Sequence, residues 1–270
     1  ANLGTTFGNS FDDDKHPDLR ADFILTNPPF GKTVYWPAAA LQGDPRFIYG
    51  TPPGNKVNFV WLQHYLHHLA QTGTAVTVMP NGSLTANQSV EVEIKAKLVD
   101  ADKVECIVML PSQLFYGVQI PVCLWFLTHD KSARKVRTER PQRDRAGEVL
   151  FIDARQLGVM VDRAHRELTN DEIERIADTY HAWRGEPVVE PYADVPAFCA
   201  SVTLDVIRQH DYSLVPGRYV GSEVLDGDEV SNAEKISRLR EVMETGFAER
   251  ASVQAEVLAA LSLLEDVTNE

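Results

Sequence analysis

Alternating apolar runs and helical stripes along the chain predict a parallel α/β sheet. Apolar runs of strand length occupy five segments, at residues 22–26, 74–79, 104–109, 122–128 and 149–152. Between the first two runs, the segment 58–70 carries apolar residues at helical spacing, at Phe59, Leu62, Leu66 and Leu69. Gly73 is expected to separate this helix from the next strand, and a second helix is expected over 90–100. Strand, crossover helix and strand form the repeating unit of a parallel sheet.

The pattern changes after residue 153, which divides the chain into three expected parts. Residues 1–153 read as the later part of a doubly wound sheet, and residues 154–230 mix short helices such as 171–184 with proline-rich connectors. Residues 231–270 carry helical stripes, at Ile236, Leu239, Val242, Met243 and Phe247, and at Val253, Val257, Leu261 and Leu264. These stripes either pack on their own domain or dock on the helices of another subunit.

The first apolar run ends at Asn27-Pro28-Pro29-Phe30. Proline fixes its own φ and restricts the residue before it, so the chain turns stiffly here. In open α/β sheets, ligands bind beyond the carboxyl ends of the strands. An asparagine amide and an aromatic ring at such a place suit a planar base that bears an amino group. The alternative is an ordinary proline turn.

Together with later segments, this motif resembles the modification subunit of type I restriction–modification systems. The resemblance covers about residues 3–225, in which these segments match the family: Gly8-Asn9-Ser10-Phe11, Asn27-Pro28-Pro29-Phe30, Asn58-Phe59, Val78-Met79-Pro80-Asn81-Gly82, Leu110-Pro111-Ser112-Gln113-Leu114-Phe115-Tyr116, 120–127, 147–155 and 216–221. The resemblance implies an α/β fold, a Rossmann-like class I methyltransferase sheet of which the chain holds the later strands, followed by an α-helical C-terminal region. It also implies an N6-adenine DNA methyltransferase that uses S-adenosyl-L-methionine.

The resemblance assigns roles to residues of the motif. The Asn27 amide oxygen and the Pro28 carbonyl accept from the adenine amine, within the turn that Pro29 stiffens, and Phe30 stacks on the flipped base. Asn9 and Phe59 correspond to contacts with the donor, and Phe115 or Tyr116 to the other wall of the base pocket. For Phe59 and Phe115, ordinary core packing is the alternative.

The chain departs from the family because no glycine-rich loop follows an apolar strand near its start. Its first glycines, Gly4 and Gly8, have no such strand before them. We therefore expect this to be the C-terminal part of a longer subunit, inactive by itself and unable to bind the donor tightly.

Composition and charge narrow the choice of partners. The chain has 44% hydrophobic residues, no apolar run long enough for a membrane span and no signal peptide, so a cytoplasmic protein is expected. The net charge of −13 disfavours strong DNA binding by this chain alone. The resemblance implies that a specificity subunit reads the DNA and that a restriction subunit completes the complex. An unpaired strand at 22–26 also predicts self-association.

Two local clusters invite other interpretations. The segment 131–145 holds seven basic and two acidic side chains, a local charge of +5. It is either a solvated hairpin loop or a loop that contacts DNA phosphates through Arg134, Lys135 and Arg137. The histidines at 64, 67 and 68 lack an evident further ligand, so no metal site is expected.

Two alternative functions remain open from the residues. Protein glutamine-N5 methyltransferases hold a side-chain amide nitrogen with the same Asn-Pro-Pro-aromatic motif. A truncated, non-catalytic chain could instead serve as an interaction module for a DNA-specificity subunit. The long extension after residue 153 favours the DNA enzyme.

Overall fold

The computed structural model describes residues 8–11, 13–29, 41–54, 56–85, 89–115, 120–135, 141–188, 190–222, 236–241, 243–245, 247, 250 and 253–254. The chain divides into two compact units, residues 1–222 and residues 223–270. Among the described helices, none has the length and apolar character required to cross a membrane.

The first unit contains sheet strands, α-helices, short hairpin strands and 3-10 turns. The strands of the main sheet are β1 (Ala21–Thr26), β2 (Leu69–Pro80), β3 (Val104–Met109), β4 (Val122–Thr128), β7 (Glu148–Asp153) and β10 (Cys199–Thr203). The helices are α1 (Asn58–His68), α2 (Ser89–Asp100), α3 (Asn170–Trp183) and α4 (Leu204–Gln209). Short elements are β5 (Arg134–Lys135), β6 (Pro141–Gln142), β8 (Val159–Met160), β9 (Arg166–Glu167), η2 (Asn81–Ser83) and η3 (Pro216–Arg218).

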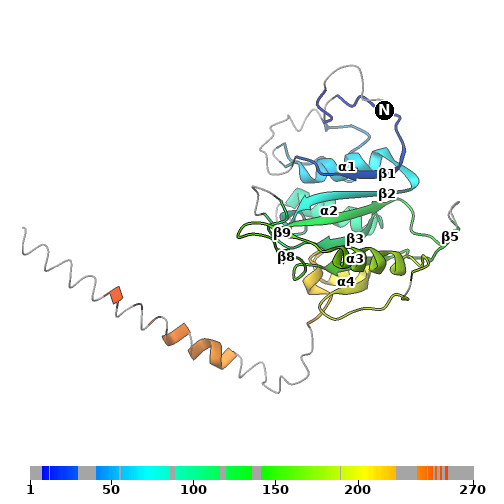
Figure 1. Cartoon of the computed structure of the whole chain (residues 1–270). Coiled ribbons are helices and arrows are strands. Elements are labelled where there is room, and N and C mark those ends of the chain that lie inside the picture. The colour runs from blue at the N-terminus through cyan, green and yellow to red at the C-terminus, as the bar shows by residue number, and fades with distance from the viewer. Residues whose placement is uncertain are drawn as a thin grey trace, which may run out of the picture. The chain divides into compact units, whose positions relative to one another are not determined.

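The main sheet has six strands in the order β1-β2-β4-β3-β7-β10 (Figure 1). β1 pairs with β2 and β3 pairs with β7 in parallel, whereas β4 runs antiparallel to both β2 and β3. β10 returns to the sheet antiparallel to β7, so residues after 153 extend the same sheet. The predicted α/β class is confirmed, and so are the predicted positions of β1, β3, β4 and β7, but the sheet is mixed and not parallel throughout as predicted.

The sequence places the boundary between α1 and β2 differently from the structure. The helix ends at His68, and β2 runs through Gly73 instead of starting after it. The pairing register shifts between Ala21 and Phe23 of β1, opposite this glycine. A Cβ on Gly73 would lie 2.8 Å from the Ala21 carbonyl oxygen, so glycine lets the two backbones approach.

Helices cover both faces of the sheet. On one face α1, α2 and α4 bury a core that includes Leu62, Ile94 and Ile207. On the other face α3 buries a second core through Tyr180 and Trp183. Thr169 and Glu172 form a capping box that fixes the start of α3.

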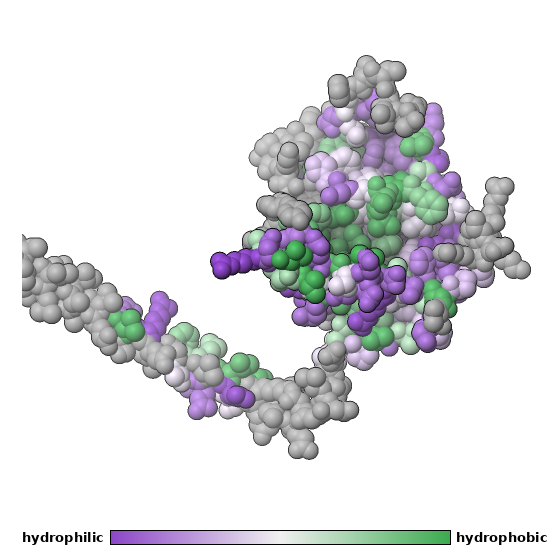
Figure 2. Space-filling view, viewed as in Figure 1, coloured by the Kyte–Doolittle hydropathy of each residue, from purple (hydrophilic) through white to green (hydrophobic). Residues whose placement is uncertain are grey.

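β1 forms one edge of the sheet and is incompletely covered. Phe23 and Leu25 are 83% and 85% exposed, while Ile24, between them on the opposite face, packs on the α1 core. The strand expected to be buried is therefore bare on one face. Apolar surface is visible over this part of the molecule, above α3 (Figure 2).

In the second unit, residues 236–241 and 243–245 are helical. The predicted apolar stripe is exposed there at Ile236, Leu239, Met243 and Phe247, and Val253 is also exposed. The positions Val242, Val257, Leu261 and Leu264 lie outside the described residues.

Candidate functional site at the carboxyl end of β1

β1 ends at Thr26, directly before the predicted catalytic motif. Asn27 and Pro29 are exposed and Pro28 is buried, so the turn is anchored by one ring and presents an amide beside it. Phe30 is not among the described residues. Asn27 is therefore accessible at the end of a strand, and its role in binding a base stays a prediction.

Two hydroxyl groups meet immediately before this turn. The Thr26 Oγ1 donates to Thr77 Oγ1 of the neighbouring strand over 2.9 Å. Burial raises the pKa of Tyr65 on α1, and the side chains of Thr26 and Thr77 oppose this rise. The two threonines are 51 residues apart, so their contact leaves no signal in the sequence.

The carboxyl end of β2 lies next to that of β1 and continues into η2. Trp125 Nε1 donates to Ser83 Oγ over 2.9 Å, which holds this turn against β4. The Asn81 Oδ1 is buried, and no described group donates a hydrogen bond to it. The family resemblance includes this segment but assigns no role to Asn81.

The segment that carries Asn9 is held in place by Arg46. The Arg46 guanidinium donates to the backbone oxygens of Ser10 and Phe11, each over 2.5 Å, and pairs with Asp44. Asn9 is exposed, and its Oδ1 accepts from the Phe11 backbone N–H over 3.2 Å. This turn holds the predicted donor contact at the surface, beside the α1 side of β1.

Asp14, His64 and His68 come together in the same region. Their ligand atoms lie within 4.8 Å of one another. The Asp14 carboxylate lies 2.9 Å from His68 Nε2. Asp14 is thus the third group that the histidine spacing does not reveal. Burial opposes ionisation of Asp14, but hydrogen bonds from the His16 backbone and His68, with the nearby His64 ring, leave its pKa lowered.

The donor atoms of this cluster suit hydrogen bonding better than metal binding. Arg46 NH1 lies 3.2 Å from His64 Nδ1, and a guanidinium can only donate. Burial, followed by His68 and Arg46, lowers the pKa of His64 to about 4, so the ring is neutral at pH 7. Its other nitrogen then carries the proton and has no lone pair for a metal.

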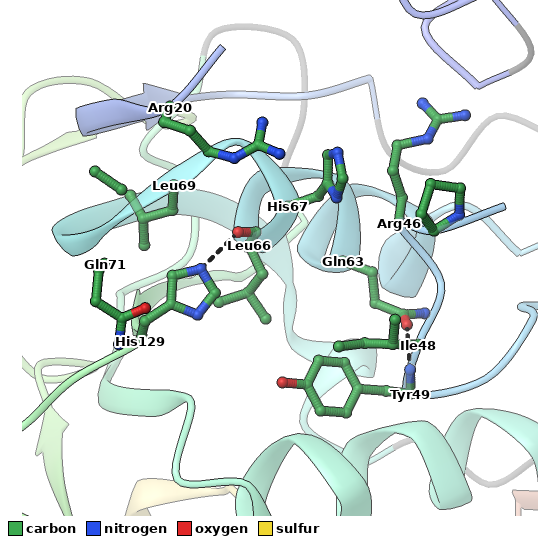
Figure 3. Close-up of a pocket in the computed structure, with 12 residues that line it drawn as sticks. Arg20, Arg46, Ile48, Tyr49, Gln63, Leu66, His67, Leu69, Gln71 and His129 are labelled. Carbon is green, nitrogen blue, oxygen red and sulfur yellow. Dashed lines mark hydrogen bonds between the residues drawn. The ribbon is translucent and has the colours of Figure 1, made fainter. Parts of the chain in front are cut away.

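Two cavities flank α1. One, of about 400 Å³, is lined by residues between Gly8 and Leu19 together with Ile24, His64, Tyr65 and His68. The other, of about 460 Å³, lies at the amino end of β2 (Figure 3). There His129 Nε2 lies 2.8 Å from the Leu66 carbonyl oxygen, and Gln63 binds the Tyr49 backbone. Because this end is opposite the motif, we assign the second cavity no part in the chemistry.

The two aromatic residues that the resemblance singles out have different environments. Phe59 is fully buried and meets Trp125 edge-on, with ring centroids 6.3 Å apart. Core packing, the alternative interpretation, therefore accounts for its position, and a donor contact stays a prediction. Phe115 is half-buried beside the α3 core, within the loop that follows β3. Tyr116 lies outside the described part of the chain.

The basic segment 131–145 presents fewer free charges than its composition indicates. Three of its charges are used internally: Lys131 pairs with Asp102 over 2.6 Å, Arg143 with Glu148 over 2.7 Å, and Arg145 with Glu105 over 3.0 Å. The local charge of +5 was therefore a wrong measure of free basic surface. β5 and β6 form the expected hairpin.

Of the three residues predicted to contact phosphates, the structure describes only one side chain. Arg134 NH2 donates to the Thr72 backbone oxygen over 3.1 Å. The Lys135 side chain and Arg137 fall among the residues that the structure leaves undescribed.

The chain is similar to a family of DNA methylases and to methylase subunits of type I restriction enzymes. A family model described as N-6 DNA Methylase matches residues 1–228. The chain is 42% identical over 255 residues to the methylase subunit of the type I restriction enzyme HindI from Haemophilus influenzae, covering 94% of this chain and 54% of that protein. It is 35% identical to the type I restriction enzyme MjaIX methylase subunit of Methanocaldococcus jannaschii, covering 94% and 44%.

A solved structure shares the fold. The crystal structure of a type I restriction-modification system methyltransferase subunit from Streptococcus thermophilus matches with a TM-score of 0.66 and 25% identity, over 80% of this chain and 41% of that chain. The chain thus spans about half the length of the curated relatives it matches.

Proposed function

The chain belongs to the N-6 DNA methylase family, and on that premise we propose that it carries the base-binding part of an N6-adenine DNA methyltransferase subunit of a type I restriction–modification complex. The observation that carries this proposal is the exposed Asn27 amide beside the buried Pro28, at the carboxyl end of β1. The two relatives described above are methylase subunits of type I restriction enzymes, which supports a DNA base as the substrate. They do not favour the glutamine alternative.

The chemistry follows from the weak nucleophilicity of the adenine amine. Its lone pair is delocalised into the ring, so the nitrogen must pyramidalise before it attacks. The Asn27 amide oxygen and the Pro28 carbonyl oxygen would accept hydrogen bonds from the two N–H groups and favour the pyramidal form. S-adenosylmethionine supplies the electrophilic methyl group when it is bound. The chain's own part is to hold and orient the amine.

The target base must leave the duplex to reach this edge of the sheet. Phe30 would stack on one face of the base, with Phe115 or Tyr116 near the other. Stacking of this kind contributes about 1–3 kcal/mol per base. A Phe30→Tyr variant keeps the ring face and should methylate normally, whereas Phe30→Ala should lose base positioning.

The residues present fit only one side of a donor site. Asn9 offers an exposed amide, and Phe59 is buried in the core. Near the start of the sequence, no glycine-rich loop follows an apolar strand, so no such loop brings its backbone close to the donor. A few hydrogen bonds of about 1 kcal/mol each barely offset the cost of association, about 4 kcal/mol or more.

We therefore expect the 270-residue chain to bind S-adenosylmethionine with a dissociation constant no better than about 1 mM. Calorimetric titration of the chain measures this directly. Micromolar affinity would show that the glycine-rich loop is dispensable.

The partners would be DNA, a specificity subunit and a restriction subunit, in the cytoplasm. With a net charge of −13, the chain needs a partner to bring the duplex to it. The exposed stripe at Ile236, Leu239, Met243 and Phe247 supports docking of the second unit on such a subunit. Arg134, Lys135 and Arg137 would contact phosphates of that duplex. The same stripe would suit the second candidate function, a non-catalytic interaction module.

Acceptor specificity tests the proposal. The native polypeptide that carries these residues is incubated with labelled S-adenosylmethionine and a specificity subunit. The acceptors are duplex DNA, the same duplex with N6-methyladenine at the site, and a glutamine-bearing peptide. Label on the unmodified duplex alone is expected. Label on the peptide would favour the glutamine enzyme, and no label on any acceptor would leave the interaction module.

A further inference from the structure

The segment 8–19 carries Asn9, yet its described residues form neither helix nor strand. Such a segment keeps its place through individual contacts with the rest of the fold. Arg46 supplies one of them, by binding two backbone oxygens near the start of the segment. His68, the last residue of α1, supplies another, and its side chain is buried, with the residue 5% exposed.

Both ring nitrogens of His68 face acceptors of this segment. Nε2 lies 2.9 Å from the Asp14 carboxylate, and Nδ1 lies 3.2 Å from the Leu19 carbonyl oxygen. Neither of these oxygens donates, and a neutral imidazole has a single N–H. The ring therefore makes both hydrogen bonds only in its doubly protonated form, in which the bond to Asp14 is charge-assisted.

His64, one turn earlier on α1, has the opposite kind of partner. Its ring centroid lies 4.5 Å from that of His68. Its Nδ1 lies 3.2 Å from Arg46 NH1, and a guanidinium only donates. The contacts of His64 therefore require an acceptor nitrogen, whereas those of His68 require two donors. The geometry places the positive charge of this histidine pair on His68.

Asp14 connects His68 to the turn that carries Asn9. The Asp13 backbone N–H donates to the Asn9 backbone oxygen over 2.8 Å, so Asp14 directly follows a closed turn. Arg46 binds backbone oxygens within that turn. The Asn9 turn is therefore held from both sides, by Arg46 within it and by His68 just after it.

We propose that His68 is a positioning residue for donor binding, which holds the Asn9 turn against α1. It does so by bridging the Asp14 carboxylate and the Leu19 backbone. This inference rests on the proposed function, in which Asn9 contacts the donor and His68 does not. Loss of the ring, or of one of its protons, breaks the bridge and frees Asn9. Losing one fixed hydrogen bond to the donor corresponds to about a fivefold to tenfold loss of affinity.

The neighbouring histidine is a matched control. His67 lines the cavity at the amino end of β2, whereas His68 lines the cavity beside the segment 8–19 (Figure 3). His67→Phe and His68→Phe each replace an imidazole with a ring that has no nitrogen, but only the second removes the bridge. Asp14→Ala breaks the bridge from its other side and leaves α1 unchanged.

The first measurement does not depend on activity. Hydrogen exchange of the peptide that covers residues 8–14 is followed in the native polypeptide, without donor or DNA. Exchange should be faster in His68→Phe and in Asp14→Ala than in the unchanged protein, and unchanged in His67→Phe. Equal exchange in all four proteins would overturn the bridge, whether or not the protein methylates adenine.

The second measurement is calorimetric titration of the native polypeptide with S-adenosylmethionine. The dissociation constant should rise about fivefold to tenfold in His68→Phe and in Asp14→Ala, and the double variant should be no worse than either. His67→Phe should bind as the unchanged protein does. A merely structural His68 would lower thermal stability and leave the dissociation constant unchanged, which would overturn the proposal.

The protonated bridge also predicts a pH profile. Histidine changes its charge between about pH 5 and pH 8, so donor affinity should be weaker at about pH 8 than at about pH 6. The titratable groups around the ring are Asp14 from the segment and His64 and His67 from α1. His67→Phe should keep the profile and His68→Phe should flatten it. The same pH dependence in His68→Phe as in the unchanged protein would contradict the proposal.

The measurements separate the possible failures. Faster exchange in His68→Phe with unchanged donor affinity would refute the positioning role and keep the bridge. Absence of adenine methylation by the unchanged protein would refute the proposed function, while exchange and donor titration would still decide what His68 does.

Discussion

The two edge strands of the sheet differ in how much of their apolar surface is covered. At β10, Cys199 and Val202 are 1% and 7% exposed, and the Ser201 backbone N–H donates to Asp194. At β1, Phe23 and Leu25 are more than four-fifths exposed. The covered edge places its polar groups in internal bonds, for example Trp183 Nε1 to Ser201 Oγ over 2.8 Å. The open edge ends in the motif Asn27-Pro28-Pro29.

The difference indicates where stability and function reside. An apolar, open edge strand is a place where further protein packs or copies associate. The β10 edge needs no such cover, because α3 and α4 and the preceding loop supply it. The β1 edge therefore leaves apolar surface uncovered, while the β10 edge is part of the packed fold.

The same substitution at both edges tests this division most strongly. Val202→Lys places an unpaired charge in a covered position and should destabilise the chain by about 4 kcal/mol. Leu25→Lys replaces an exposed side chain and should change the free energy of unfolding by less than about 0.5 kcal/mol. Urea denaturation measures both. Equal losses would show that β1 is covered in solution.

Self-association gives the same comparison a second readout. Leu25→Lys should reduce concentration-dependent association of the 270-residue chain in sedimentation experiments, because it places a charge on the apolar edge. Ile173→Lys, at an exposed position on α3, is the matched control and should leave association unchanged. Association that persists in Leu25→Lys would direct attention to another surface.

The covered side of the molecule also contains a buried ion pair whose loss should be costly. Arg145 is fully buried and pairs with Glu105, which also accepts from the Tyr180 hydroxyl over 2.8 Å. Glu105→Gln leaves the guanidinium without its counter-charge and should cost about 3 kcal/mol. The exposed Asp205→Asn, which removes a partner of Arg208, should leave the denaturation midpoint unchanged. A Glu105→Gln midpoint equal to that of Asp205→Asn would contradict the role given to this pair.

The open side should show a smaller, pH-dependent effect through His64. Its pKa is about 4 in the folded chain and about 6.5 when unfolded, so the unfolded state binds more protons between these values. Stability should therefore fall as pH drops from 6.5 towards 4, by about 1–2 kcal/mol after discounting for the partly exposed ring.

The groups that face His64 set the control for this measurement. Arg46, His68 and His67 disfavour its protonation, and Asp14 favours it. The pKa of Asp14 is lowered from 3.8, so this carboxyl group titrates at a pH below the range from 4 to 6.5. His64→Gln should flatten the dependence of unfolding free energy on pH between 6.5 and 4. An unchanged slope in that variant would assign the effect to His67 or His129, whose pKa values are also lowered.

The sequence predicts the strands and the motif because both depend on local pattern. Apolar runs bounded by Gly and Pro locate β1, β3, β4 and β7 within a residue or two, and Asn27 follows β1 as predicted. Strand direction is not encoded in such runs, so the antiparallel β4 was not foreseen. Nor was Gly73 inside β2, since a glycine that permits close backbone approach resembles one that breaks a strand.

Long-range pairing limits what the sequence reveals about the site. The charge count of 131–145 could not show that Lys131 and Arg145 are buried against Asp102 and Glu105. The Thr26–Thr77 hydrogen bond, like the Asp14–His68 contact, joins segments that lie far apart in the chain. Such contacts become visible only when the strands and α1 are placed together.

The most direct test of the central claim is the rate of N6-methyladenine formation by Asn27→Ala in the native polypeptide with its specificity subunit. Asn170→Ala, at the exposed start of α3, is the control. Digested DNA is measured by mass spectrometry, and unfolding is measured on the same proteins. The account predicts at least a hundredfold loss of rate for Asn27→Ala, equivalent to about 2.7 kcal/mol of transition-state stabilisation, with unchanged stability. Methylation within tenfold of the unchanged protein would contradict it.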